Sequence, residues 1–180
     1  MEFQKTGIDG LVVLQPKVCS DNRGYFFETY HINVFKQAGI NDQFLQDNES
    51  LSAKGVLRGL HFQKPPFAQG KLVRVITGSV LDVAVDIRKA SPTYGKYFAM
   101  ELNGVNKKML WIPPGFAHGF VSLEEDTVFS YKCTNVYNSE LEVCVLWNDL
   151  ELNINWRINE LKVSSKDNIG LRFNQLNSPF

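Results

Sequence analysis

The sequence predicts an all-β fold, a sandwich or barrel with only a few short helices. Short apolar runs recur at spacings of roughly 8 to 12 residues, which is typical of such folds. The chain has 13 glycines and 7 prolines, which punctuate these runs. A jelly roll is one arrangement that protects the sheet edges of many short strands. With 180 residues and a hydrophobic content of 44%, we expect one domain, residues 1–180, with a sizeable core.

The clearest strand is predicted over residues 79–88, where side chains alternate in character. One face would carry the aliphatic residues at positions 81, 83, 85 and 87, whereas Asp82, Asp86 and Arg88 would make the other face partly polar. Gly78 marks a turn or bulge after a preceding strand. The other predicted strands span residues 71–77, 98–102, 108–112, 120–123, 127–134 and 142–147.

Helical signals are confined to two short segments. Residues 31–38 predict one helix, which Gly39 would cap at its C-terminus. The polar tail over 161–180 is expected to carry a helical turn that begins near Ser164 or Ser165. No repeat or domain linker interrupts the chain.

Composition excludes several classes of partner. Nineteen basic and 19 acidic residues give zero formal net charge, so no global field favours nucleic acid or an anionic membrane. No stretch approaches the roughly 18 to 20 apolar residues of a membrane span, and no signal peptide is visible. We therefore expect a cytoplasmic protein. Cys19, Cys133 and Cys144 are far apart and odd in number, which predicts reduced packing residues rather than disulfides or a zinc knuckle.

The segment over residues 55–63, Gly-Val-Leu-Arg-Gly-Leu-His-Phe-Gln, carries the first functional signal. It places Arg58 and His61 in a run of otherwise mainly apolar and small residues. Histidine moves protons near neutral pH, and arginine suits a phosphate or carboxylate. The first hypothesis is a proton-transfer site on an anionic ligand. The alternative is a structural histidine whose ring satisfies neighbouring polar groups.

The spacing of the three histidines argues against a metal centre. Metal-binding cupins would place a second histidine two residues after His61, but the chain has Gln63 there. A later segment supplies only His118, for which a structural role is favoured, and His31 lies in the predicted helix. A first-row metal usually takes three or four N, O or S ligands. We expect no metal and no cofactor, with a metalloenzyme as the less favoured alternative.

Several segments, taken in order, closely resemble the dTDP-4-dehydrorhamnose 3,5-epimerase family. They are residues 21–28, 55–63, 69–75, 91–95 and 111–120, Tyr131 with Tyr137, and residues 147–149. The resemblance implies a cupin-like jelly-roll barrel that forms a homodimer and uses no metal or cofactor. It also implies inversion of carbons 3 and 5 in a 4-keto-6-deoxyhexose linked to dTDP.

The same resemblance assigns four catalytic residues. His61 would be the general base, and Asp167 would accept its other ring N–H. Lys71 would stabilise the enolate oxygen, and Tyr131 would return a proton to the opposite face. Asp82 would support the site less directly. Read without the resemblance, Asp167 and Lys71 are solvated charges and Tyr131 is a packing residue.

The substrate contacts implied by the resemblance fall into two groups. Arg23 and Arg58 would hold the diphosphate, because guanidinium groups match its oxyanions. The stacking and polar contacts would come from Phe26 and Tyr137, and from Glu28, Gln46 and Asn48. The segment over residues 23–28 is expected to reach in from the neighbouring subunit. Taken alone, residues 21–24 predict a turn before an aromatic strand.

Two departures from the family pattern lie near the end of the chain. Leu150 replaces the proline that often follows Trp-Asn-Asp, and residues 168–171 replace a stretch that usually carries alanine and proline. Both bear on the local path around Asp167. Two alternatives stay open: a single-carbon epimerase on a related nucleotide-linked 4-keto sugar, and a catalytically silent cupin that binds a sugar nucleotide.

Overall fold

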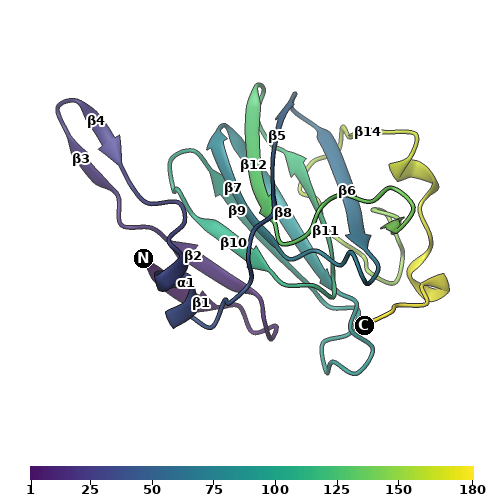
Figure 1. Cartoon of the computed structure of the whole chain (residues 1–180). Helices are drawn as coiled ribbons and strands as arrows, with labels where there is room; N and C mark the ends of the chain where they lie inside the picture. The colour runs from purple at the N-terminus through teal and green to yellow at the C-terminus, as the bar shows by residue number, and fades with distance from the viewer.

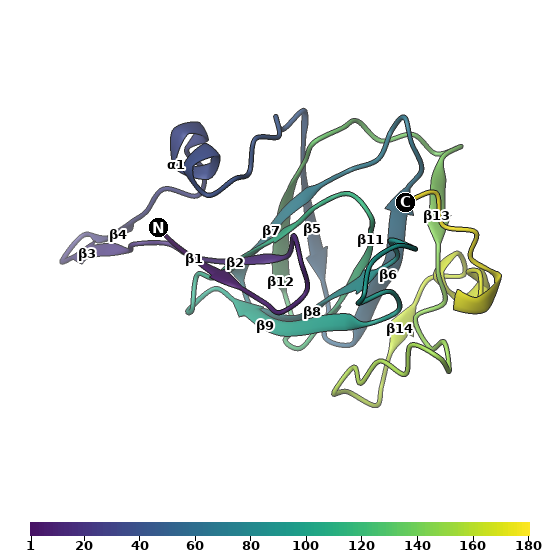
Figure 2. The same cartoon turned by 90° about the horizontal axis from the view of Figure 1, so that it is seen from below.

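The computed structural model describes residues 1–180, and two large sheets face each other in it (Figures 1 and 2). The first sheet has the spatial order β1 (Glu2–Lys5), β2 (Val12–Gln15), β10 (Met109–Ile112), β7 (Lys71–Thr77), β12 (Thr127–Cys133) and β5 (Gln46–Ser52). The second has the order β13 (Glu142–Cys144), β6 (Val56–Gln63), β11 (Phe116–Ser122), β8 (Ser79–Asp86) and β9 (Tyr97–Asn103), with β14 (Lys162–Val163) parallel to β6. This arrangement confirms the predicted all-β, cupin-like jelly roll.

Most predicted strands are present. The prediction over residues 71–77 matches β7, and those for β9, β10 and β12 differ by at most one residue at either end. The strand predicted over 79–88 ends at Asp86, because its carboxylate accepts the backbone N–H of Arg88 at 3.0 Å and turns the chain.

Two further strand boundaries differ from the predictions by more than one residue. Strand β11 begins at Phe116, four residues before the predicted 120, because the chain becomes extended directly after Gly115. Strand β13 ends at Cys144 instead of residue 147. Beyond it, Val145 forms only an isolated bridge, because the polar tail returns to pair with it there.

Strand β8 is buried on both faces. Its aliphatic face, which includes Leu81 and Val83, packs under the C-terminal segment through residues such as Trp156 and Phe173. Its other face packs between the two sheets, and Asp82 on that face has no exposed surface. The partly polar face predicted from the sequence therefore points into the barrel interior. Each buried aliphatic side chain contributes roughly 1.5–3 kcal/mol to stability.

The N-terminal region adds a helix and a projecting hairpin. Helix α1 (Ile32–Gln37) begins after His31, whose Nδ1 accepts the Asn33 N–H at 3.3 Å, and Gly39 follows it with a φ of +82°. Strands β3 (Cys19–Asp21) and β4 (Gly24–Phe26) form a ribbon that extends away from the barrel (Figure 1). None of the helices has the length and apolar character needed to cross a membrane.

The tail carries two short 3₁₀ helices, η1 (Asp167–Ile169) and η2 (Phe173–Gln175). Helix η1 corresponds to the helical turn predicted near Ser164 or Ser165, and it begins two residues after Ser165. In Figure 1 the yellow tail lies alongside β6, the strand that carries His61. The tail thus brings Asp167 to the barrel wall.

Candidate active site

A cavity of about 360 Å³ opens between the two sheets. Its walls come from β5, β6, β7, β11, β12 and the C-terminal tail. It contains five of the residues that the sequence singled out, and His118 as well. The lining residues are Ser50, Val56, Leu57, Arg58, His61, Lys71, His118, Phe120, Phe129, Tyr131, Lys162, Ser164, Lys166 and Asp167.

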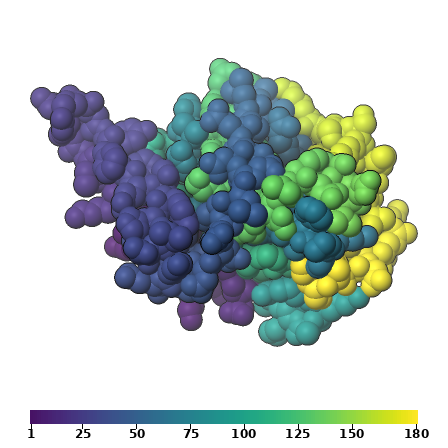
Figure 3. Space-filling view, viewed as in Figure 1, coloured from purple at the N-terminus to yellow at the C-terminus, as the bar shows by residue number.

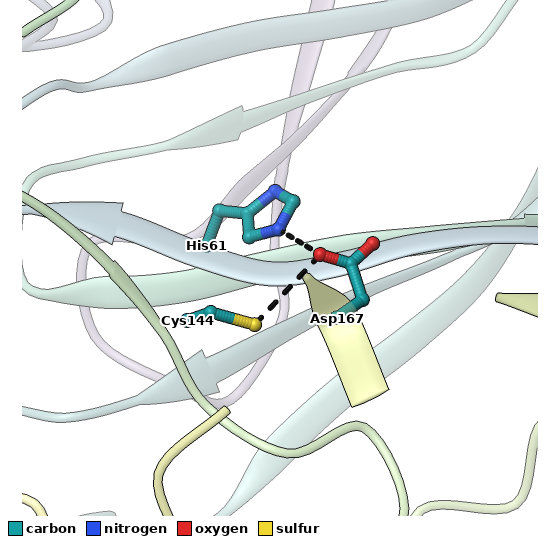
Figure 4. A group of neighbouring side chains, drawn as sticks. All are labelled: His61, Cys144 and Asp167. Atoms are coloured by element: carbon teal, nitrogen blue, oxygen red, sulfur yellow. Dashed lines mark hydrogen bonds and ion pairs between the residues drawn. The ribbon is translucent and has the colours of Figure 1, made fainter. Parts of the chain in front are cut away.

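His61 and Asp167 form a hydrogen-bonded pair at this cavity (Figure 4). His61 Nε2 lies 2.6 Å from Asp167 Oδ1, although 106 residues separate the two in the chain. Asp167 is 3% exposed, and its backbone N–H donates to Ser164 Oγ at 3.1 Å. Burial disfavours the carboxylate, but the His61 hydrogen bond and nearby donors hold the pKa of Asp167 below its usual value. An ionised Asp167 accepts a hydrogen bond from His61 Nε2–H, which leaves the lone pair of Nδ1 free to accept a proton from a ligand.

Close packing of two strands helps to position His61. Gly59 on β6 faces Gly119 on β11 so closely that a Cβ on Gly59 would lie 2.5 Å from Gly119 Cα. Gly59 also has a φ of +143°, which disfavours any other residue. The ladder beside this contact pairs His61 directly with His118. A larger residue at either glycine would push the two strands apart.

Lys71 is the first residue of β7 and projects into the cavity opposite β6. Its Nζ has no hydrogen bond or ion pair within the protein. Burial lowers the pKa of the Lys71 ammonium, and the charges of Cys133 and two carboxylates only partly offset that effect. A cation that is partly removed from water and has no fixed partner can stabilise a negative oxygen that develops in the cavity.

Tyr131 lies on β12, between Asn48 of β5 and Val73 of β7. Its hydroxyl makes no hydrogen bond within the protein, and it lines the same cavity. Burial raises the pKa of Tyr131, whereas the positive charge of Arg58 acts in the opposite direction. The phenol therefore holds its proton and can donate it.

His118 and Asp82 form a second hydrogen-bonded pair. His118 Nε2 lies 2.8 Å from Asp82 Oδ2, and the side chains are 7% and 0% exposed. The other oxygen, Asp82 Oδ1, is buried without a partner. The structural role favoured for His118 left out its place in the cavity wall. Only the pairing of β11 with β8 and β6 brings these residues to the site.

The remaining substrate-contact candidates of the main body lie near the cavity. Arg58 is exposed at its edge, where Nε donates to Ser52 Oγ at 3.3 Å. Gln46, Asn48 and Tyr137 form a connected group outside the lining. Gln46 donates to Asn48 Oδ1 at 2.9 Å and accepts the Tyr137 backbone N–H at 2.7 Å.

Three candidates are separate from the cavity of this chain. Arg23 lies at the tip of the β3–β4 hairpin, paired with Asp21 at 2.6 Å, and Phe26 is 71% exposed. Glu28 is also exposed, just after the hairpin. Figure 3 shows this purple arm projecting from the body into solvent. The arm therefore adds nothing to its own chain's cavity.

Two further contacts had no signal in the sequence. Glu142 Oε2 accepts the Tyr137 hydroxyl at 2.7 Å and also pairs with Lys166. Cys144 is the cross-strand partner of His61, and its Sγ lies 3.8 Å from Asp167 Oδ1 (Figure 4). Burial, together with the Asp167 carboxylate, raises the pKa of the Cys144 thiol to about 12.

The ligand atoms of His61, Cys144 and Asp167 all lie within 4.8 Å of one another. This group is the one place where the structure gathers side chains of the kinds that hold a transition metal. The expectation of no metal rested on how the histidines and cysteines are spaced along the chain. It could not detect a thiol and a carboxylate brought in by β13 and by the tail.

Comparison with known proteins agrees with the resemblance found in the sequence. A family model described as dTDP-4-dehydrorhamnose 3,5-epimerase matches residues 5–175. The dTDP-4-dehydrorhamnose 3,5-epimerase of Shigella flexneri is 49% identical over 174 residues, which cover 96% of each chain.

Solved structures are similar over nearly the whole chain. The crystal structure of dTDP-6-deoxy-D-glucose-3,5-epimerase from Legionella pneumophila, in complex with dTDP-4-keto-L-rhamnose, has a TM-score of 0.95 and 44% identity, covering 98% of this chain and 94% of that one. A 3'-monoepimerase from Streptomyces bikiniensis in complex with dTDP-quinovose has a TM-score of 0.89 and 29% identity, covering 94% and 86%. By sequence and by structure, this chain belongs to the dTDP-4-dehydrorhamnose 3,5-epimerase family.

Proposed function

We propose that this protein is an isomerase that converts dTDP-4-dehydro-6-deoxy-D-glucose into dTDP-4-dehydro-L-rhamnose by epimerising carbons 3 and 5. One observation carries the proposal: the His61–Asp167 pair lines the same cavity as the unpaired ammonium of Lys71 and the unpaired phenol of Tyr131. A base, a cation for an oxyanion and an acid are the three groups that this reaction requires.

The reaction begins at a carbon next to the ketone. His61 Nδ1 removes the proton, while Asp167 holds the other ring nitrogen and stabilises the imidazolium that forms. The electron pair of the C–H bond forms a double bond between this carbon and the carbonyl carbon of the sugar. The ketone oxygen thereby becomes an enolate oxygen beside Lys71. The low local dielectric strengthens that ion pair.

Inversion requires a donor on the face opposite the base. His61 belongs to β6 of one sheet, whereas Tyr131 belongs to β12 of the other, and the cavity lies between them. Tyr131 gives its proton to the carbon, the carbonyl re-forms, and the proton on His61 returns to solvent or to the tyrosinate. The same sequence of steps then serves the second carbon.

The nucleotide contacts belong to the same proposal. Arg58 lies at the edge of the cavity and suits a diphosphate, and Tyr137, which is linked to Gln46 and Asn48, suits a thymine. The exposed hairpin with Arg23 and the nearby Phe26 and Glu28 would reach the site of a partner subunit, which makes the enzyme a homodimer. A metal-free reaction and a cytoplasmic location complete the proposal.

The decisive experiment follows exchange of substrate hydrogen with solvent. The purified protein is incubated with dTDP-4-keto-6-deoxyglucose in deuterated water, and NMR monitors carbons 3 and 5. Deuterium at both carbons, with formation of the L-rhamno product, supports the double epimerase. Normal dTDP binding without any exchange would instead identify a catalytically silent binding protein.

A single-carbon epimerase is the second candidate. The similarity to the 3'-monoepimerase from Streptomyces bikiniensis, at a TM-score of 0.89, supports keeping it. The two reactions use the same base and enolate, and they differ in which carbons the cavity presents to His61. Exchange confined to one carbon would select this candidate.

A further inference from the structure

Cys144 places a thiol beside the proposed base, and the mechanism above gives it no task. It lies on β13, directly across from His61 on β6. Its Sγ contacts Asp167 Oδ1 at 3.8 Å, and the same oxygen lies 2.6 Å from His61 Nε2 (Figure 4). One nitrogen, one sulfur and one oxygen therefore converge on a small volume.

We propose that His61, Cys144 and Asp167 bind a zinc ion, and that this ion inhibits the enzyme. Zinc takes imidazole nitrogen, thiolate sulfur and carboxylate oxygen in tetrahedral sites. A thiolate ligand disfavours magnesium and calcium, which require oxygen. The site is an inhibitory one, distinct from any cofactor role, because it occupies the nitrogen that orients the proposed base.

The observed distances are close to those of a tetrahedral site. With typical zinc–ligand bond lengths, neighbouring ligand atoms lie roughly 3.4 to 3.7 Å apart. The Sγ–Oδ1 distance of 3.8 Å is just above this range, and all three ligand atoms lie within 4.8 Å of one another. The distance between Nε2 and Oδ1, now 2.6 Å, must increase by about 0.8 Å to reach the lower end of this range.

The site also has a path for entry and a position for a fourth ligand. His61 and Asp167 both line the cavity, and the His61 side chain is 24% exposed. Hydrated zinc can enter there, bind the three protein ligands in place of water, keep one water on the cavity side and release its other water ligands to solvent. This open position is usual for zinc sites that have three protein ligands.

Binding would change the protonation of two groups. Cys144 loses its thiol proton to solvent and forms the Zn–S bond, which offsets the cost of ionising this buried thiol. At His61 the Nε2 lone pair bonds to zinc, so the single proton of the neutral ring resides on Nδ1. His61 then has no free lone pair, and it cannot remove a proton from the sugar. No oxidation or reduction takes place.

The binding part of this inference stands alone, whereas the inhibition part rests on the proposed role of His61. Cobalt(II) is the probe for binding, because a cobalt–thiolate bond gives a charge-transfer absorption in the near ultraviolet. Adding one equivalent of Co²⁺ to metal-free wild-type protein should produce this absorption. Cys144→Ala should not show it, whereas Cys19→Ala, which removes an exposed thiol on the hairpin, should keep it.

Inhibition is measured by titrating Zn²⁺ into the deuterium-exchange assay. Cys144→Ala should retain wild-type activity without zinc, and it should require at least about tenfold more zinc for half inhibition. A chelator should restore the wild-type enzyme. Equal zinc sensitivity of wild type and Cys144→Ala, or absence of the cobalt–thiolate absorption from wild type, would overturn the proposal. If wild type binds cobalt through Cys144 but performs no exchange, the zinc site stands and the proposed function fails.

Discussion

His61 and His118 face each other across the β6–β11 ladder, and each ring is bonded through Nε2 to its own aspartate. The two pairs differ in access. The His61 side chain is 24% exposed, whereas that of His118 is 7% exposed, and the Asp82 paired with it is fully buried. A substrate that enters the cavity therefore reaches His61 more readily, which favours it as the base.

Replacing Asp167 with asparagine should impair the base without unfolding the site. The amide keeps the size of the carboxylate but cannot stabilise the imidazolium that His61 becomes during proton abstraction. We expect kcat to fall by about 10²–10⁴ with little change in KM, because the loss concerns the transition state. Steady-state kinetics of the exchange reaction measure both constants. Wild-type activity in Asp167→Asn would show that the pair has no catalytic role.

Lys71→Met tests the cation at the ketone oxygen. Methionine retains most of the packing of the lysine stem and removes the ammonium, so the enolate loses its counter-charge. We expect a loss of about 10²–10³ in kcat. The affinity for dTDP, measured by calorimetry, should stay at the wild-type level, since the proposed nucleotide contacts are other residues. A variant that weakens dTDP binding and kcat equally would point to a structural role for Lys71.

Asp82→Asn should shift the pH dependence of activity. The Asp82 carboxylate raises the pKa of Lys71, which burial lowers below its ordinary value. Activity requires the ammonium form, so it falls as pH rises through the lowered pKa of Lys71. Removing the carboxylate lowers that pKa further, and the alkaline limb of the kcat/KM profile should move to lower pH.

The matched control for this shift is Asp47→Asn. Asp47 pairs with Lys132 on the surface, with a side chain that is 67% exposed, and it does not line the cavity. Its removal should leave the alkaline limb unchanged. An alkaline limb that stays in place or moves to higher pH in Asp82→Asn would contradict the coupling between Asp82 and Lys71.

Strands with strong alternation or clear turn residues were predictable from the sequence, as β7 and β8 illustrate. Strand β5 was not predicted because its residues are mostly polar, and it owes its place to pairing with β12. Of the proposed catalytic residues, His61 has a signal in its own segment, whereas Asp167, Lys71 and Tyr131 could be named only through the family resemblance. Asp167 lies 106 residues after His61, and nothing in local spacing reports such a contact. The same holds for Cys144, because a cysteine on a short strand looks like a packing residue.

Asp86 should make a pH-dependent contribution to stability. Its carboxylate is fully buried and accepts hydrogen bonds from Arg88, Ser91 and Thr93. Although burial disfavours the charge, these donors lower the pKa of Asp86 from 3.8 to about 2. A carboxylate with a lowered folded-state pKa stabilises the fold fully above the unfolded value. This contribution, about 2 kcal/mol, is lost as pH falls through the interval between the two values.

Urea denaturation of Asp86→Asn at several pH values tests this contribution. The variant should be less stable than wild type at pH 7, and the difference should shrink as the pH approaches 2. Thermal or urea midpoints that differ equally at pH 7 and near pH 2 would assign the loss to altered packing instead of ionisation.

The projecting hairpin predicts complementation between two defective subunits. Arg23→Ala should weaken substrate binding through the arm, whereas His61→Asn removes the base from the cavity. If the arm completes the partner's site, an exchanged mixed dimer has one site with an intact base and an intact arm. A statistical mixture should regain about a quarter of wild-type activity at low substrate concentration, since half of the dimers are mixed and each has one good site.

The control is a mixture of His61→Asn with Lys71→Met. Both residues line the cavity of the same chain, so no mixed dimer has a complete site. Recovery in the control as well, or none in the first mixture after confirmed subunit exchange, would mean that the arm does not act across the dimer.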